Sequence, residues 1–169
     1  MKKTPCHPLL QITLLALLLA TGNLAFAEVE IGELSYIDKS YMQQQRERVA
    51  QLSESNLGRK LKGTRDNDLD ILQQLLDRKL VTGDQTLELQ ALGVIMGDLL
   101  AEELGLDWVI YEDKLGRSRA LRYRQTDNYL FPITMISRRR EVDNTETVTE
   151  IYQRALASMA AVIEPLPFQ

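Results

Sequence analysis

The segment from Gln85 to Leu104 has apolar side chains around more than half of a helical surface, and this feature constrains the fold most. A helix that is apolar over so much of its circumference is normally buried at the centre of a domain. Gly105 follows directly and is typical of a helix C-cap. The sequence therefore predicts a central helix that other elements must cover. Its apolar residues are Leu89, Leu92, Val94, Ile95, Met96, Leu99, Leu100 and Leu104.

Gly93 and Gly97 lie four residues apart on this helix. In a membrane such a spacing indicates a dimerising helix, but Asp98, Glu102 and Glu103 argue against that interpretation. Each glycine costs a helix about 1 kcal/mol relative to alanine. We therefore interpret the two glycines as positions where another helix or the sheet crosses closely.

After Gly105 the pattern changes from helical to alternating, which is typical of β-strands. "LDWVIYED" predicts one strand, with Trp108 beside Ile110 on one face, and "RALRYR" predicts a second. Gly116 lies in the turn between them. A third strand is predicted from Tyr129 to Ser137, with Pro132 favouring an edge position because proline cannot donate to a ladder.

Helical patterns flank these strands. One helix is expected from Tyr41 to about Leu57, another after an N-cap at Asp66 or Asn67, and a last one after Asn144 or Thr145. Residues 28–40 are expected to lie partly extended on the surface. The fold class is therefore α+β: N-terminal helices, a three-stranded antiparallel meander and a C-terminal helix in one layered domain.

The first residues have the order of a secretory signal. Lys2 and Lys3 precede an apolar run, "LLQITLLALLLA", and Ala25 and Ala27 form the small-x-small pattern at which signal peptidase cleaves. The run is shorter than the roughly 20 residues of a membrane span. We expect an exported protein, in the periplasm or secreted. The predicted division is a signal peptide at 1–27, a segment with one helix and a basic linker at 28–63, and the α+β domain at 64–169.

Cleavage would remove Cys6 and His7, the only cysteine and histidine. Without thiol and imidazole, disulfides, Cys-His or Ser-His-Asp catalysis and typical zinc sites are excluded. We predict no metal and no cofactor, while carboxylate chemistry of the glycosidase type stays open. Loss of two lysines would change the net charge from −4 to −6. Such a balance argues against non-specific binding to nucleic acid.

Two stretches, "LGVIMGDLLAEELGLDWVIYEDKLGRSRALRYR" and "LFPITMISRR", together resemble a bacterial family, the domain of unknown function numbered 3806. The resemblance covers roughly residues 89–139 and implies an exported bacterial protein of a Gram-negative envelope. It implies no activity. The residues that carry it are Leu92, Gly93, Gly97, Leu104, Gly105, Trp108, Asp113, Gly116, Arg117, Ala120, Leu121, Arg122, Phe131, Pro132, Met135 and Arg138. Among these, the expected packing positions are Gly93, Gly97, Gly105, Trp108, Gly116, Phe131 and Pro132.

Arginines gather in the predicted β region, although the chain as a whole is acidic. Their planar forks bind carboxylates and phosphates through two parallel hydrogen bonds. They are candidates for a surface that recognises an anionic partner, or else they form solvated ion pairs with nearby carboxylates. The candidate residues are Arg117, Arg119, Arg122, Arg124, Arg138, Arg139 and Arg140.

The resulting hypothesis is a non-catalytic domain that binds an anionic macromolecule of the cell envelope, either a protein or an envelope polymer. We expect no nucleic-acid partner and no membrane span after signal removal. One alternative is an immunity or inhibitor protein against an envelope-targeted toxin or hydrolase. The other is a carboxylate-dependent hydrolase of cell-wall glycan.

Overall fold

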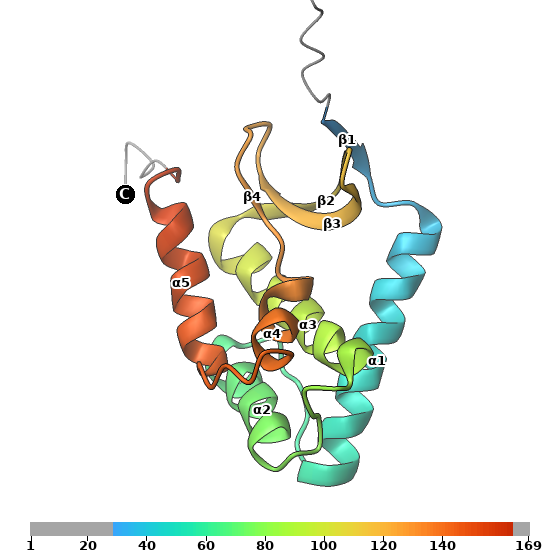
Figure 1. The fold of residues 1–169 in the computed structure, drawn as a ribbon, viewed down its shortest axis with the longest axis vertical. Helices are drawn as coiled ribbons and strands as arrows, with labels where there is room; N and C mark the ends of the chain where they lie inside the picture. The colour runs from blue at the N-terminus through green and yellow to red at the C-terminus, as the bar shows by residue number, and fades with distance from the viewer. Residues whose placement is uncertain (1–28, 164–169) are drawn as a thin grey trace, which may run out of the picture.

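Nine helices and strands follow one another along residues 29–163, which are the residues that the computed structural model describes. The sheet lies across one end of the helices (Figure 1), so the fold is α+β, as predicted. The predicted signal peptide, with Ala25 and Ala27, lies outside the described residues. In chain order the elements are β1 (Glu30–Glu33), α1 (Tyr36–Leu57), α2 (Arg65–Asp77), α3 (Thr86–Leu104), β2 (Leu106–Asp113), β3 (Gly116–Tyr123), β4 (Tyr129–Leu130), α4 (Ile133–Arg140) and α5 (Val148–Ala160).

Helix α3 is the central element of the core. Ten of its 19 residues are buried, and it contacts α1, α2, α4 and α5 as well as β2 and β3. Leu92, Met96 and Leu100 are fully buried, and burial of each such side chain contributes about 1.5–3 kcal/mol. Helix α1 packs on α3 through a narrower stripe that includes Met42 and Val49. Among residues 29–163, no helix has both the length and the apolar character needed to cross a membrane.

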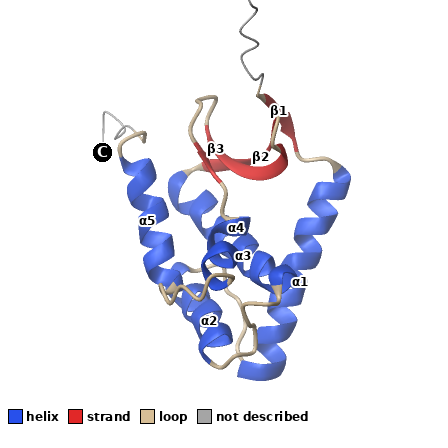
Figure 2. Cartoon of the chain, in the orientation of Figure 1, coloured by secondary structure: helices blue, strands red, loops and turns tan. Residues whose placement is uncertain are grey.

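The sheet has four antiparallel strands in the order β1-β2-β3-β4, one more than the three predicted. Figure 2 shows β1, β2 and β3 together at the end of the molecule away from α2. The additional strand is β1, which lies in the region expected to be merely extended and pairs with β2 from Glu30↔Glu112 to Glu33↔Val109. Strands β2 and β3 pair along their whole length around a two-residue turn. Gly116 closes that turn with a φ of 129°, a conformation that favours glycine.

The predicted third strand, Tyr129 to Ser137, is wrong after its first two residues. Only Tyr129 and Leu130 pair with β3, and α4 begins at Ile133. Pro132 is not inside an edge strand but caps this helix with φ −65° and ψ −29°, since proline is pre-organised for a helix start. The β-branched "ITMIS" sequence has strand propensity, but packing of Ile136 and Ser137 into the interior overrides it.

Two helices begin at capping boxes that the sequence prediction placed elsewhere. Helix α1 starts at Tyr36 because the Ser35 hydroxyl accepts a hydrogen bond from the Asp38 backbone N–H, while the Ser35 N–H donates to the Asp38 carboxylate. Helix α5 is capped in the same way by Thr147, not by Asn144 or Thr145. In α2 the cap is Thr64, not Asp66 or Asn67. In each capping box the reciprocal bonds satisfy backbone donors that would otherwise lack a partner.

Helix α4 crosses α3 at the two glycines. A Cβ at Gly93 would lie 2.7 Å from the Cα of Ile133, and one at Gly97 would lie 2.5 Å from the Trp108 ring and 2.7 Å from Cγ of Pro132. Such distances are shorter than real Cβ contacts, so only glycine permits this crossing. The close approach fixes α4 and everything it carries against the core.

Candidate anion-binding site

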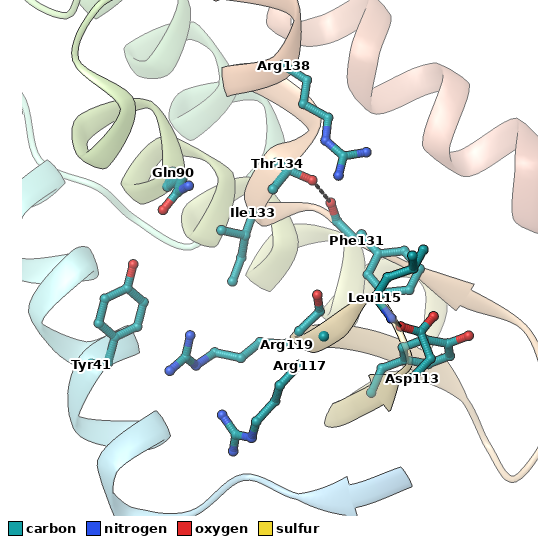
Figure 3. Close-up of a pocket in the computed structure, with 13 residues that line it drawn as sticks. Tyr41, Gln90, Asp113, Leu115, Arg117, Arg119, Phe131, Ile133, Thr134 and Arg138 are labelled. Carbon is teal, nitrogen blue, oxygen red and sulfur yellow. Dashed lines mark hydrogen bonds between the residues drawn. The ribbon is translucent and has the colours of Figure 1, made fainter. Parts of the chain in front are cut away.

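A cavity of about 470 Å³ lies between α1, the first half of α3, the β2–β3 hairpin and α4 (Figure 3). Tyr41 comes from α1, Gln90 from α3, Arg117 and Arg119 from β3, and Arg138 from α4. Volumes of about 300–1,000 Å³ are usual for pockets that hold ligands. Three of the seven candidate arginines therefore meet around one space.

Asp38 holds two of these arginines in place. Its side chain is 2% exposed and receives two hydrogen bonds from Arg117, at 3.0 and 2.7 Å. Arg119 forms a further ion pair with it, Nη2 to Oδ1, at 2.8 Å. The Arg117 hydrogen bonds hold the pKa of the Asp38 carboxyl well below its usual range, against the opposing effect of burial and with help from Ser35 and Arg119. Asp38 is therefore charged at neutral pH, and the two guanidinium groups are fixed before any ligand arrives.

Arg119 also stacks on an aromatic ring. Its guanidinium carbon lies 4.4 Å from the centroid of the Tyr41 ring, a distance that gives a favourable cation–π interaction. The buried Nε of Arg119 has no hydrogen-bond partner within the described part of the chain. Buried polar atoms are normally satisfied, so this atom marks an unfilled hydrogen-bonding capacity beside the cavity.

Arg138 differs from the other two arginines of the cavity. Its side chain extends from α4 towards the space lined by Phe131 and Thr134 (Figure 3). Within residues 29–163, its guanidinium has no ion-pair and no hydrogen-bond partner, and the residue is exposed. It is thus a cation at the cavity wall that the described chain leaves without a counter-ion.

The remaining β-region arginines do not reach the cavity. The Arg122 Nε donates to the Thr126 carbonyl at 2.8 Å, and its guanidinium lies 5.6 Å from the centroid of Tyr129. Arg124 is exposed at the end of β3, where it lies over Tyr123. Arg122 thus lies in β3 where it pairs with β4, and Arg124 lies in the turn between the two strands.

Arg139 and Arg140 stabilise the connection between α4 and α5. Arg139 forms an ion pair with Glu146 at 2.6 Å and donates to the Met135 carbonyl. Arg140 donates to the carbonyl oxygens of Asn144 and Glu146. These contacts close a loop. The structure therefore separates the arginine run that the sequence presents as one group.

Guanidinium groups outnumber carboxylates in the cavity lining. Arg117, Arg119 and Arg138 line it together with one carboxylate, Asp113, while Asp38 and Glu112 partly offset the charge of Arg117. The Asp113 carboxylate is further engaged by the backbone N–H of Leu115, at 2.8 Å. The arrangement can bind one additional anionic group near Arg138. Among residues 29–163, no cluster of carboxylate, histidine or cysteine side chains is arranged to hold a metal ion.

The expected packing positions determine where these side chains stand. Pro132 and Ile133 lie against Gly93 and Gly97, which places α4 and thus Arg138 on one side of the cavity. Phe131 packs edge-on against Tyr111, with ring centroids 5.3 Å apart. Gly105 ends α3 in the left-handed conformation and leads directly into β2. The ring of Trp108 covers Gly97, and its Nε1 donates to Asp98 at 3.1 Å.

Asp98 belongs to a separate polar link between elements. Asp98 and Glu102 lie four residues apart, a spacing that predicts one shared, solvated helix face. In the structure Asp98 accepts two hydrogen bonds from Arg46, at 2.7 and 2.9 Å, in addition to the one from Trp108. It therefore connects α1, α3 and β2, and its carboxylate oxygens already accept hydrogen bonds from Arg46 and Trp108.

Sequence reasoning missed the residues that α1 and α3 bring to the cavity. Asp38, Tyr41 and Gln90 are separated from β3 by long stretches of chain and carry no motif of a binding site. The available signal was the spacing Ser35-x-x-Asp38, which is typical of a capping box. That spacing predicts a helix start but does not predict the long-range ion pairs of Asp38.

Comparison with known proteins adds a family and a fold. A family model described as "Domain of unknown function (DUF3806)" matches residues 68–152. A crystal structure from Bacteroides thetaiotaomicron is similar with a TM-score of 0.69 at 19% sequence identity, over 78% of this chain and 48% of that one. At such identity the likeness shows the fold alone, and the chain spans about half the length of that protein. No curated protein matches the chain.

Proposed function

The chain belongs to the family described as a domain of unknown function (DUF3806), and from that premise we propose a function drawn from the cavity. The protein binds an anionic group of a macromolecular partner between the β2–β3 hairpin and α4, without catalysis. The observation that carries the proposal is Arg138, a cation without a counter-ion within residues 29–163, at the wall of a cavity that also holds Arg117 and Arg119.

Pre-organisation supports this proposal. Arg117 and Arg119 are fixed by Asp38, and Arg119 is stacked on Tyr41. A ligand therefore does not have to immobilise these two long side chains, which otherwise costs about 0.5–1.5 kcal/mol each. The incoming anion meets a positive potential that is already oriented towards it.

The aromatic walls favour a large partner over a free ion. Tyr41, Tyr111 and Phe131 line the cavity beside the arginines. A carboxylate or phosphate attached to a chain with apolar groups contacts both kinds of wall, whereas a simple inorganic anion contacts only the charged one. We therefore infer a macromolecule that presents an anionic group next to apolar surface.

The proposed place of action is the cell envelope. This part of the proposal depends on the signal-like residues 1–27, which contain the Ala25-Phe26-Ala27 pattern. The acidic chain repels other polyanions over most of its surface. Binding is then local to the cavity and not a general property of the protein.

Titration with fluorescently labelled polyacrylate tests the proposal, because this polymer supplies carboxylates without any peptide or sugar. The substitution Arg138→Glu is expected to weaken binding at least about tenfold. A hydrogen bond to a charged group contributes about 1.5–3 kcal/mol, and tenfold corresponds to about 1.4 kcal/mol.

Arg124→Glu is the matched control, because Arg124 is exposed at the end of β3 and does not line the cavity. It makes the same change of charge and should leave the affinity within about twofold, because water and salt screen an exposed charge that does not contact the bound group. Equal losses in both variants would mean that polyacrylate senses only the total charge. The cavity would then have no special part in binding.

A further inference from the structure

Strand β3 has an open edge along its first half. Strand β4 pairs with it only at Leu121↔Leu130 and Arg122↔Tyr129, although β3 begins at Gly116. The chain then turns away at Pro132 into α4. Within the described residues, the stretch from Gly116 to Ala120 therefore pairs with β2 on one side and with no strand on the other.

The backbone groups that face this open edge belong to Arg117 and Arg119. The Tyr123 N–H donates to the Asn128 carbonyl on the β4 side, at 3.2 Å. In an antiparallel strand successive residues direct their N–H and C=O groups to opposite edges, so Arg117 and Arg119 point to the same side as Tyr123. Ser118 points the other way, towards its partner Tyr111 on β2.

The open edge borders the cavity already described. Gly116, Arg117, Ser118 and Arg119 form one wall, while Ile133, Thr134 and Arg138 of α4 form another. A further strand would lie about 4.7–4.9 Å from β3, which places it in the space between these walls (Figure 3). Its side chains would then lie within reach of Arg138.

We propose that an acidic, extended peptide segment of a partner protein adds to this edge as a fifth strand. Its main chain pairs with the N–H and C=O groups of Arg117 and Arg119, and one of its carboxylates pairs with Arg138. Addition of a strand in this way obtains affinity from main-chain hydrogen bonds and selectivity from side-chain contacts. The inference rests on the proposed anion site and names the chemistry of its ligand.

The edge itself favours a peptide over other polyanions. It presents both donors and acceptors, alternating at the repeat of a β-strand. A peptide main chain offers the complementary acceptor and donor at the same repeat. Polyphosphate and polyacrylate offer acceptors only, so they leave the outward C=O groups of Arg117 and Arg119 without a donor.

Amide hydrogen exchange, followed by NMR on the full chain, tests strand addition directly. The probe is a hexapeptide of alternating valine and glutamate, acetylated and amidated at its ends and used at millimolar concentration. We expect exchange of the Arg117 and Arg119 amides to slow at least about tenfold when the peptide is bound, because new hydrogen bonds protect them. The Ser118 amide, which already faces β2, serves as the internal control and should not change.

Two further measurements separate the inference from the function on which it rests. The same peptide N-methylated at its four central residues keeps its charge but loses main-chain donors, and should bind at least about tenfold more weakly, a difference of about 1.4 kcal/mol. Equal binding of both peptides, or unchanged exchange at Arg117 and Arg119, would overturn strand addition. If polyacrylate still required Arg138, the anion site would remain. If Arg138→Glu bound polyacrylate as tightly as the wild type, the anion site itself would be rejected.

Discussion

Asp38 has two opposing effects at the residue scale. It is buried and stabilises the fold by joining the start of α1 to Arg117 and Arg119 of β3. The same carboxylate cancels one positive charge at the cavity and so opposes the binding of another anion. Removal of this charge is therefore expected to lower the stability of the fold and to raise the affinity for an anion.

The substitution Asp38→Asn separates these two effects. It should lower the free energy of unfolding by about 1–3 kcal/mol, less than the 3–5 kcal/mol of a fully buried pair, because the Arg117 side chain keeps 42% exposure. At the same time it should tighten polyacrylate binding, since it removes one negative charge beside the cavity, while the asparagine amide oxygen still accepts a hydrogen bond from Arg117 and keeps that side chain in place. Urea unfolding and fluorescence titration measure the two quantities.

Asp107→Asn is a suitable control, because Asp107 is exposed on β2 and outside the cavity lining. It should change neither quantity appreciably. If Asp38→Asn reduced both stability and affinity, the ion pairs would be required to form the site, and the electrostatic account of Asp38 would be wrong.

The lowered pKa of Asp38 predicts how stability depends on pH. The hydrogen bonds from Arg117 depress the pKa in the folded state, while an unfolded aspartate has a pKa of about 3.9. The contribution of Asp38 to the free energy of unfolding is therefore complete above about pH 5 and is lost progressively as the pH falls below about 4.

Urea unfolding of the wild type and of Asp38→Asn between about pH 2 and pH 6 isolates this residue from the other carboxylates. The difference in the free energy of unfolding between the two proteins should shrink as the pH falls. It should shrink by at most about 1.4 kcal/mol per pH unit, the value for one proton. A difference that stayed constant over this range would show that the Asp38 ion pairs do not depress its pKa.

Helix α4 is the element that carries Arg138, and its position depends on glycine. The carbonyl oxygen and Cα of Ile133 lie where a Cβ of residue 93 would be. The sequence alone shows the Gly93 and Gly97 spacing and indicates a close crossing, but it does not identify α4 as the crossing element. The "ITMIS" sequence resembles a strand, and only the contact with α3 makes it helical.

Gly93→Ala should therefore destabilise the protein, although alanine is intrinsically the better helix former by about 1 kcal/mol. The added methyl group forces α4 away from α3, and overpacking of this kind typically costs about 1–3 kcal/mol. Because α4 moves, polyacrylate binding should weaken as well. Thermal unfolding and titration of the same sample measure both effects.

Gly97→Ala provides the comparison within the same helix. Its Cβ would meet ring atoms of Trp108 and Pro132, whereas that of Gly93 would meet backbone. Side chains yield more easily than backbone, so the loss of stability should be smaller at Gly97. The reverse order, or a stabilising effect of Gly93→Ala, would contradict the assigned crossing.

The elements that follow local periodicity could be predicted from the sequence. The apolar surface of α3 and the alternation of β2 and β3 follow from local patterns. Helix α3 and β2 have nearly the expected bounds, whereas β3 begins at Gly116, three residues before the predicted start at Arg119. Strand β1 could not be predicted, because its four residues are exposed or half-buried and show no alternation of buried and exposed side chains. The same limit applies to the site, since Arg122, Arg139 and Arg140 look like Arg117 and Arg138 in sequence but bond to neighbouring loops.

At the scale of the whole molecule, the cavity is assembled from segments distant in sequence. Tyr41, Gln90, Arg119 and Arg138 come from four different elements. Tyr41 and Asp38 precede residues 68–152, the stretch that the family model matches, whereas the other cavity residues lie within it. Helix α1 packs on α3 and completes the site. The division of the chain at residue 64 stays a prediction.

The most direct test of the account is an NMR titration of the arginine Nε–H signals with polyacrylate. The account predicts saturable shifts at Arg119 and Arg138, which line the cavity. It predicts little change at Arg122 and Arg139, whose Nε atoms are bonded to Thr126 and Glu146. Equal shifts at all four arginines, or shifts confined to Arg122 and Arg139, would contradict the claim that this cavity is the anion-binding site.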